Sequence, residues 1–162
     1  MATKKKTPET PKPQEQEPAE RKPLLGALLR LAHESVSAQI AESLAELGFD
    51  GLPAGYFTVV QPLWAEPEGV RLWDLPARAN ATEQVVAALV SQLEEHGYVE
   101  RKADPAARRI QIAFLSERGK SLVTTTHLIV ESVETRWSER LGVERVEALR
   151  DTLTAIVTED WE

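Results

Sequence analysis

The sequence predicts a mainly α-helical fold with a small β-hairpin, arranged as a winged helix-turn-helix lobe with dimerisation helices on its N- and C-terminal sides. Residues 82–96 have the apolar spacing of a helix, which Gly97 ends. Two strand-like segments follow at once, residues 98–102 and 110–115, and they form the hairpin. A helix followed by such a hairpin is typical of a winged helix-turn-helix.

The N-terminal segment, residues 1–22, is rich in Lys, Pro, Glu and Gln and contains almost nothing to bury. Such a segment does not offset its ordering entropy, so it is predicted to be a disordered tail. The rest of the chain, residues 23–162, is predicted to be one domain. It opens with an amphipathic helix over residues 23–47, for which Pro23 suits the first turn and Gly48 the end.

The winged helix-turn-helix lobe is expected over residues 53–115. A second helix spans about residues 53–64, and the Pro- and Gly-containing segment after it is a turn. Residues 70–79 read as a short third helix, with an extended residue or two before it. The loop between the two strands, residues 103–109, opens with Asp104-Pro105 and ends with two arginines.

Two further helices follow the hairpin. Ser116 is expected to cap the first of them, and Gly142 separates it from the last. The segments 23–48 and 116–162 retain long apolar stripes that the small lobe is unable to cover. The simplest way to bury those stripes is against a second copy of the chain in a two-fold dimer.

Charge is unevenly distributed along the chain. The net charge is −7, yet residues 101–120 contain six basic and two acidic residues. This basic stretch coincides with the hairpin and the start of the helix after it. There is no cysteine, no apolar run near the ~20 residues that span a membrane, and no secretory signal pattern. A cytoplasmic protein without membrane contact is therefore expected.

The segment SQLEEHGYVERKADPAARRIQIAFLSERGKSL resembles the MarR family of bacterial transcriptional regulators. It has the family's Gly-ended helix, apolar-Glu-Arg strand, Asp-Pro, double arginine and second apolar strand, and the resemblance extends over roughly residues 24–157. It implies a homodimer on pseudo-palindromic double-stranded DNA, with the helix from Thr82 in a major groove and the wing at a minor groove. It also implies a small aromatic effector and no cofactor.

Two features depart from the family pattern. Ala106 and Ala107 stand where the wing commonly carries an acid and an arginine. The recognition helix has three glutamates, Glu83, Glu94 and Glu95, and no basic residue. Both departures weaken the attraction for phosphate.

The DNA-binding candidates follow from side-chain chemistry on this fold. Three residues on the exposed helix face have side chains that can contact bases. Gln84 can form two hydrogen bonds with adenine, Ser91 can donate or accept a hydrogen bond, and Ala88 can contact a thymine methyl group. Arg108 and Arg109 suit a narrow minor groove. Asp104 is expected to support the wing by pairing with one of these arginines. The expected phosphate contacts are Arg78, Arg101 and Lys102.

Two other kinds of protein are alternatives to a DNA-binding regulator, a protein-interaction module and an enzyme. The acidic recognition helix favours a winged-helix protein-interaction module with little or no DNA binding, whereas the basic stretch favours DNA. An enzyme is poorly supported, since the three histidines lie on different predicted helices. No catalytic residue, metal ligand or phosphate-binding glycine loop is predicted.

Overall fold

The computed structural model describes residues 22–158, with all side chains among them except that of Arg108. The predicted tail thus lies outside the described residues, apart from Lys22. The elements are α1 (Leu25–Glu46), α2 (Phe57–Ala65), β1 (Val70–Arg71), α3 (Leu75–Arg78), α4 (Glu83–Glu95), β2 (Val99–Asp104), β3 (Ala107–Leu115), α5 (Glu117–Leu141) and α6 (Val143–Thr158). The predicted fold class, mainly helical with a small sheet in a winged helix-turn-helix, is confirmed.

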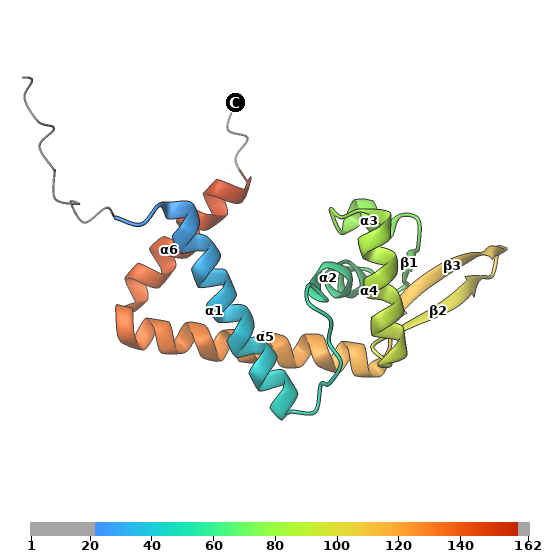
Figure 1. Ribbon diagram of the computed structural model, residues 1–162, viewed down its shortest axis with the longest axis horizontal. Helices are drawn as coiled ribbons and strands as arrows, with labels where there is room; N and C mark the ends of the chain where they lie inside the picture. The colour runs from blue at the N-terminus through green and yellow to red at the C-terminus, as the bar shows by residue number, and fades with distance from the viewer. Residues whose placement is uncertain (1–21, 159–162) are drawn as a thin grey trace, which may run out of the picture.

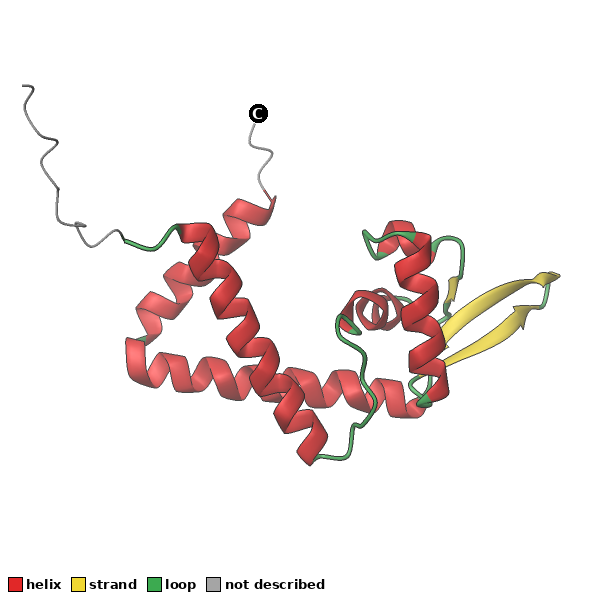
Figure 2. Cartoon of the chain, viewed as in Figure 1, coloured by secondary structure: helices red, strands yellow, loops and turns green. Residues whose placement is uncertain are grey.

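Figure 1 shows two groups of elements joined by α5. α1, α5 and α6 form one group, in which α5 contacts both other helices. α2, α3, α4 and the sheet form the winged lobe at the other end of α5, and the β2–β3 hairpin projects away from the rest of the chain (Figure 2). This arrangement presents α4 and the hairpin together, far from the α1–α6 end.

One apolar core holds the lobe together. It takes side chains from α2, α3, α4, the sheet, the start of α5 and the last turn of α1. Its fully buried members are Leu44, Val59, Val60, Leu63, Leu75, Val90, Leu93, Tyr98, Val99, Ala113, Leu122 and Val123. Burial of an aliphatic side chain of this size contributes about 1.5–3 kcal/mol. The core therefore holds α4 against α2 and the base of the wing.

The sheet has three antiparallel strands in the order β1-β3-β2. β1 corrects the prediction of one short helix over residues 70–79, because Val70 is buried opposite Ala113 and Arg71 lies opposite Ile112. A two-residue strand has no periodicity that a sequence pattern reveals. The helix that remains, α3, begins only at Leu75.

The wing is longer than predicted. β2 runs to Asp104 and β3 starts at Ala107, so most of the loop expected over residues 103–109 is strand. Only two residues, 105 and 106, form the turn, and the pairing register shifts between Ala103 and Asp104. Exposed polar strands that project into solvent lack the apolar alternation by which strands are recognised.

The predicted start of α5 and the predicted end of α4 agree with the structure, whereas the predicted start of α2 does not. Ser116 Oγ accepts a hydrogen bond from the Gly119 N–H at 3.0 Å, which caps α5. Gly97, just after α4, has φ +73°, a conformation in which glycine has no steric penalty. α2 starts at Phe57 instead of near Pro53, because a turn over residues 54–56 precedes it.

Large apolar side chains remain exposed on the three outer helices. They are Leu25, Leu28, Leu29 and Leu31 on α1, Leu128 and Leu141 on α5, and Val143, Leu149, Ile156 and Val157 on α6. Monomeric proteins rarely expose large contiguous apolar patches. α1 and α6 both contact α5 at the end of the molecule away from the lobe (Figure 1), so these side chains belong to one group of helices.

Candidate nucleic-acid interface

α4 presents the side chains that the sequence analysis selected. Val86, Leu89, Val90 and Leu93 are buried in the core, and Gln84, Ala88 and Ser91 are exposed on the opposite face. Thr82 caps the helix by accepting a hydrogen bond from the Val85 N–H at 3.3 Å. The exposed face is therefore short, partly methyl-bearing and uncharged at its centre, and this chemistry suits contact with base edges.

The tip of the wing is organised by Asp104, which is only 5% exposed. Its carboxylate accepts a hydrogen bond from the Ala106 N–H at 2.8 Å and closes the turn. Among the described side chains, Asp104 forms an ion pair with Arg71, with Nη2 3.2 Å from Oδ2. The reason is topological, because β1 lies beside β3 and brings Arg71 to the wing.

The two wing arginines differ in what the structure shows. Arg109 lies on β3 with an exposed side chain and has no ion pair among residues 22–158. The backbone of Arg108 is also in β3.

The other basic candidates are paired with carboxylates. Arg78 contacts Glu66 at 2.6 Å. Lys102 contacts Glu100 at 3.0 Å and lies 5.4 Å from the centre of the Phe114 ring. These groups are exposed, so each pair contributes only about 0–1 kcal/mol to stability.

The pair between Arg101 and Glu94 joins the wing to the recognition helix. The Arg101 guanidinium donates to the Glu94 carboxylate, and this hydrogen bond raises the pKa of Arg101 above its ordinary value. Both side chains are about one-third exposed, 36% for Arg101 and 34% for Glu94. Arg101 is thus held at the side of α4, with a carboxylate already in contact.

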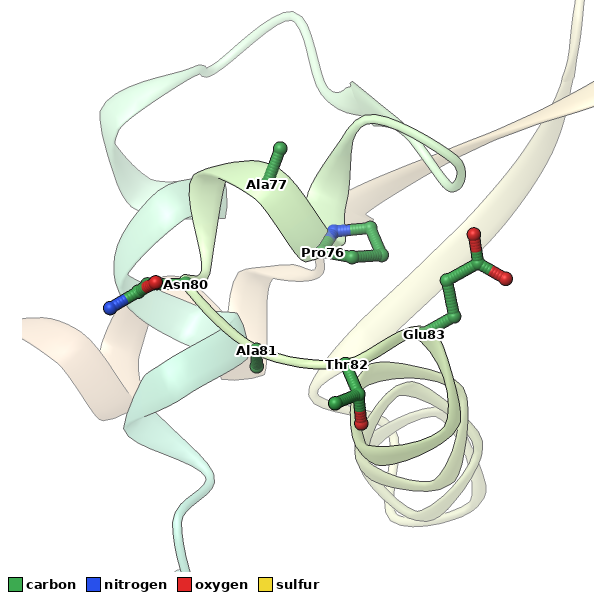
Figure 3. Close-up of a pocket in the computed structure, with 6 residues that line it drawn as sticks. All are labelled: Pro76, Ala77, Asn80, Ala81, Thr82 and Glu83. Atoms are coloured by element: carbon green, nitrogen blue, oxygen red, sulfur yellow. The ribbon is translucent and has the colours of Figure 1, made fainter.

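Two hollows flank the N-terminal half of α4. One, of about 570 Å³, is an open notch at the turn between α3 and α4. Figure 3 shows Pro76, Asn80, Thr82 and Glu83 around this turn, with the Glu83 carboxylate directed outward. The other, of about 300 Å³, lies between α4 and the base of the wing, where Ala87 and Ser91 face Trp73 and Arg101.

Sequence reasoning did not select Arg71 or Trp73 as part of this surface. Arg71 lies in β1, which the sequence pattern did not reveal, and its guanidinium is 5.7 Å from the centre of the Trp73 ring. Trp73 lies two residues after β1 and borders the hollow beside the recognition helix.

Residues 22–158 contain no group of three His, Cys, Asp or Glu side chains that could hold a metal ion. Across those residues, no helix is both long and apolar enough to cross a membrane. His96 makes a hydrogen bond of 2.9 Å with the Gln92 carbonyl at the end of α4 and is part of the helix terminus.

Comparisons with known proteins agree with this geometry. The uncharacterized HTH-type transcriptional regulator YdcH of Bacillus subtilis (strain 168) is 28% identical over 109 residues, which are 67% of this chain and 74% of YdcH. The repressor CouR, bound to a 23-mer DNA duplex, superposes with a TM-score of 0.65 at 26% identity, covering 83% of this chain and 92% of CouR.

Two further solved structures are similar. A MarR-family regulator from Rhodococcus sp. RHA1 has a TM-score of 0.64 at 26% identity, covering 85% of this chain and 95% of its own. CouR from Rhodococcus jostii RHA1 bound to p-coumaroyl-CoA has a TM-score of 0.61 at 26% identity, with 85% and 94% covered. No family profile matches the sequence.

The sheet order, the exposed α4 and the projecting hairpin define a winged helix-turn-helix protein of the kind found in transcriptional regulators. Within that class, the solved structures it resembles include MarR-family regulators, and they cover the lobe and the outer helices together. The resemblance to the MarR family is confirmed.

Proposed function

We propose that this protein is a DNA-binding transcriptional regulator that acts as a dimeric repressor and is released from DNA by a small ligand. The observation that carries the proposal is the pairing of an uncharged α4 face with an arginine-bearing wing, on the fold of a repressor that was solved on a DNA duplex. The α4 face offers groups for base edges, and the wing offers cations for phosphates.

In this proposal α4 enters a major groove. Gln84, in the first turn, forms two hydrogen bonds with adenine, while Ala88 and Ser91 contact bases further along. Recognition helices commonly use their N-terminal residues for base contacts, and the capped first turn of α4 is rigid enough for that role.

The wing supplies the electrostatic part of binding. Arg109, with Arg108, contacts the minor groove, where the negative potential is strongest when the groove is narrow. Asp104 supports the wing by holding the turn and Arg71. The paired cations Arg78, Arg101 and Lys102 are the phosphate contacts, and each exchanges a carboxylate partner for a phosphate on binding.

The dimer rests on the exposed apolar side chains of the outer helices, on which Leu28 and Leu149 are both more than two-fifths exposed. A two-fold dimer that buries them places two copies of α4 on one side of the duplex. Its site is then a pseudo-palindrome with half-sites about one helical turn, ~34–36 Å, apart.

The effector proposal rests on aromatic groups between α2 and α5. The Tyr56 hydroxyl is hydrogen-bonded to the Thr126 side chain. Burial raises the pKa of Tyr56 above its ordinary value, and the smaller, opposite effect of this hydrogen bond does not cancel the rise. The Trp64 ring meets the His127 ring edge-on, with centres 6.4 Å apart. A small aromatic ligand that separates α2 from α5 would reorient the lobe relative to the dimer helices.

The experiment is selection of bound duplexes from genomic DNA, followed by titration of the selected site with the wild type and with Arg109→Ala. We expect enrichment of a pseudo-palindrome and weaker binding by the variant at unchanged thermal stability. Unchanged binding by Arg109→Ala would refute the wing assignment. Gln111→Ala, an exposed change on the same strand, is the matched control.

The ion pairs favour one alternative, a winged-helix protein-interaction module. Cations that are already in contact with carboxylates attract phosphate less than free ones do. If the wild type enriches no duplex, and its binding to random duplex DNA is absent or does not change with salt, the alternative replaces the regulator proposal.

A further inference from the structure

We propose that Trp73 is a DNA-contact residue, whose indole packs on the sugar-phosphate backbone between the recognition helix and the wing. The inference deepens the proposed function and rests on it. It assigns to this surface an apolar contact in addition to its paired cations.

Trp73 lies in the segment between β1 and α3 and is 57% exposed. The segment is held at both ends, because the Leu72 N–H donates to the Gln111 carbonyl at 3.0 Å and the Asp74 N–H donates to the Arg71 carbonyl at 2.9 Å. A large aromatic side chain is thus presented to solvent from an ordered backbone.

The indole borders the hollow of about 300 Å³ beside α4. The α4 side of that hollow includes Ala87 and Ser91, and Arg101 lines it from β2. Ser91 belongs to the face that the proposed function turns toward the bases. A duplex that contacts this face therefore passes close to Trp73 as well.

Arg71 places a guanidinium group next to the Trp73 ring. Its guanidinium lies 5.7 Å from the ring centre, within the range of a cation–π contact, and is also paired with the buried Asp104. The indole is therefore linked through one arginine to the carboxylate that organises the wing tip. Trp73 lies at the point where the helix and the wing are joined.

The chemistry of the patch suits a nucleic-acid backbone. An indole has a large apolar face for deoxyribose and one N–H that donates to a phosphate oxygen. Arg71 and Arg101 place guanidinium groups close to the indole. An alternation of apolar sugar and anionic phosphate matches this order of groups.

The salt dependence of DNA affinity distinguishes the proposed Trp73 contact from phosphate contacts made by cations. Phosphate contacts by Lys or Arg release counterions, so their loss lowers the dependence of affinity on salt. Loss of an apolar indole contact lowers affinity at every salt concentration by the same factor. We expect about a tenfold loss for Trp73→Ala, the size that burial of part of one large side chain provides.

The test measures binding of full-length protein to a labelled random-sequence duplex by fluorescence anisotropy, at 50–200 mM salt. Trp73→Ala should bind more weakly with the same salt slope, and Trp73→Phe, which keeps an aromatic face without the N–H, should lie between it and the wild type. Leu47→Ala is the matched control, because Leu47 is also a large apolar side chain, 61% exposed, but lies at the end of α1 outside the proposed DNA surface. It should bind like the wild type.

The outcomes separate this inference from the proposed function. If the wild type binds and Trp73→Ala binds equally well, the inference fails alone. A flatter salt slope for Trp73→Ala also overturns it, since that result assigns the residue to charge positioning through Arg71. If the wild type binds no duplex even at the lowest salt, the proposed function fails and the inference fails with it. Thermal unfolding of each variant verifies that the exposed substitution leaves the fold intact.

Discussion

Glu94→Gln should strengthen DNA binding, because it frees the wing cation that is closest to the recognition helix. In the wild type the Arg101 guanidinium donates to the Glu94 carboxylate, and both side chains are about one-third exposed. Glutamine keeps the size and the hydrogen-bonding capacity but removes the charge. At this exposure the lost ion pair costs about 0.2–1 kcal/mol of folding stability, so the variant should remain folded.

The magnitude follows from counterion release. One additional cation that neutralises a phosphate adds about 0.9 to the slope of log affinity against log salt. Between 50 and 200 mM, a fourfold range, that slope corresponds to about a 3.5-fold larger loss of affinity for the variant than for the wild type. The advantage of Glu94→Gln should therefore be greatest at low salt and shrink steadily as salt rises.

The assay is a salt titration of duplex binding with Glu94→Gln, Arg101→Ala and the double variant. In the Arg101→Ala background, Glu94→Gln should no longer steepen the slope, because the freed cation is absent. Glu131→Gln, on α5 outside the lobe, makes the same change in net charge and should have little effect. A steeper slope in the double variant, or an equal gain from Glu131→Gln, would refute the reasoning.

Two other predictions address the packing and the dimer. In Gly119→Ala the new Cβ would lie 2.1 Å from the carbonyl oxygen of Tyr98, so urea unfolding should show about 1–3 kcal/mol lower stability. The control, Ser121→Ala on the same helix, should show little change. Equal stability of the two variants would contradict the close packing at Gly119. Leu149→Glu should dissociate the dimer in sedimentation measurements, whereas Thr154→Glu, about 140° away around α6, should not, and an intact Leu149→Glu dimer would exclude that face as the interface.

The helices were largely predictable because their ends are marked by local chemistry. α4 differs by one residue at each end from the predicted range of 82–96. Thr82 caps its start, and Gly97 takes the left-handed conformation that follows its end. Such signals act within a few residues of one another, so a single sequence contains them completely.

The short strand β1 and the ion pairs were less predictable, because they depend on residues that are far apart in the sequence. β1 exists only because Val70 and Arg71 pair with β3, about forty residues later. Arg71, which pairs with Asp104, is 33 residues away from it, so sequence proximity gives no indication of this contact. Likewise, Arg78 and Glu66 are separated by 12 residues, and only the packing of α2 and α3 brings them together.

The paired cations have a consequence for selectivity. A cation that must leave a carboxylate before it contacts a phosphate gains less from any duplex, whatever its sequence. The net charge of −7 acts in the same direction over longer distances. Base contacts by Gln84 do not depend on free cations. Because a regulator is limited by the ratio of specific to non-specific binding, weakening the common electrostatic part while keeping the base contacts favours the correct site over the competing ones.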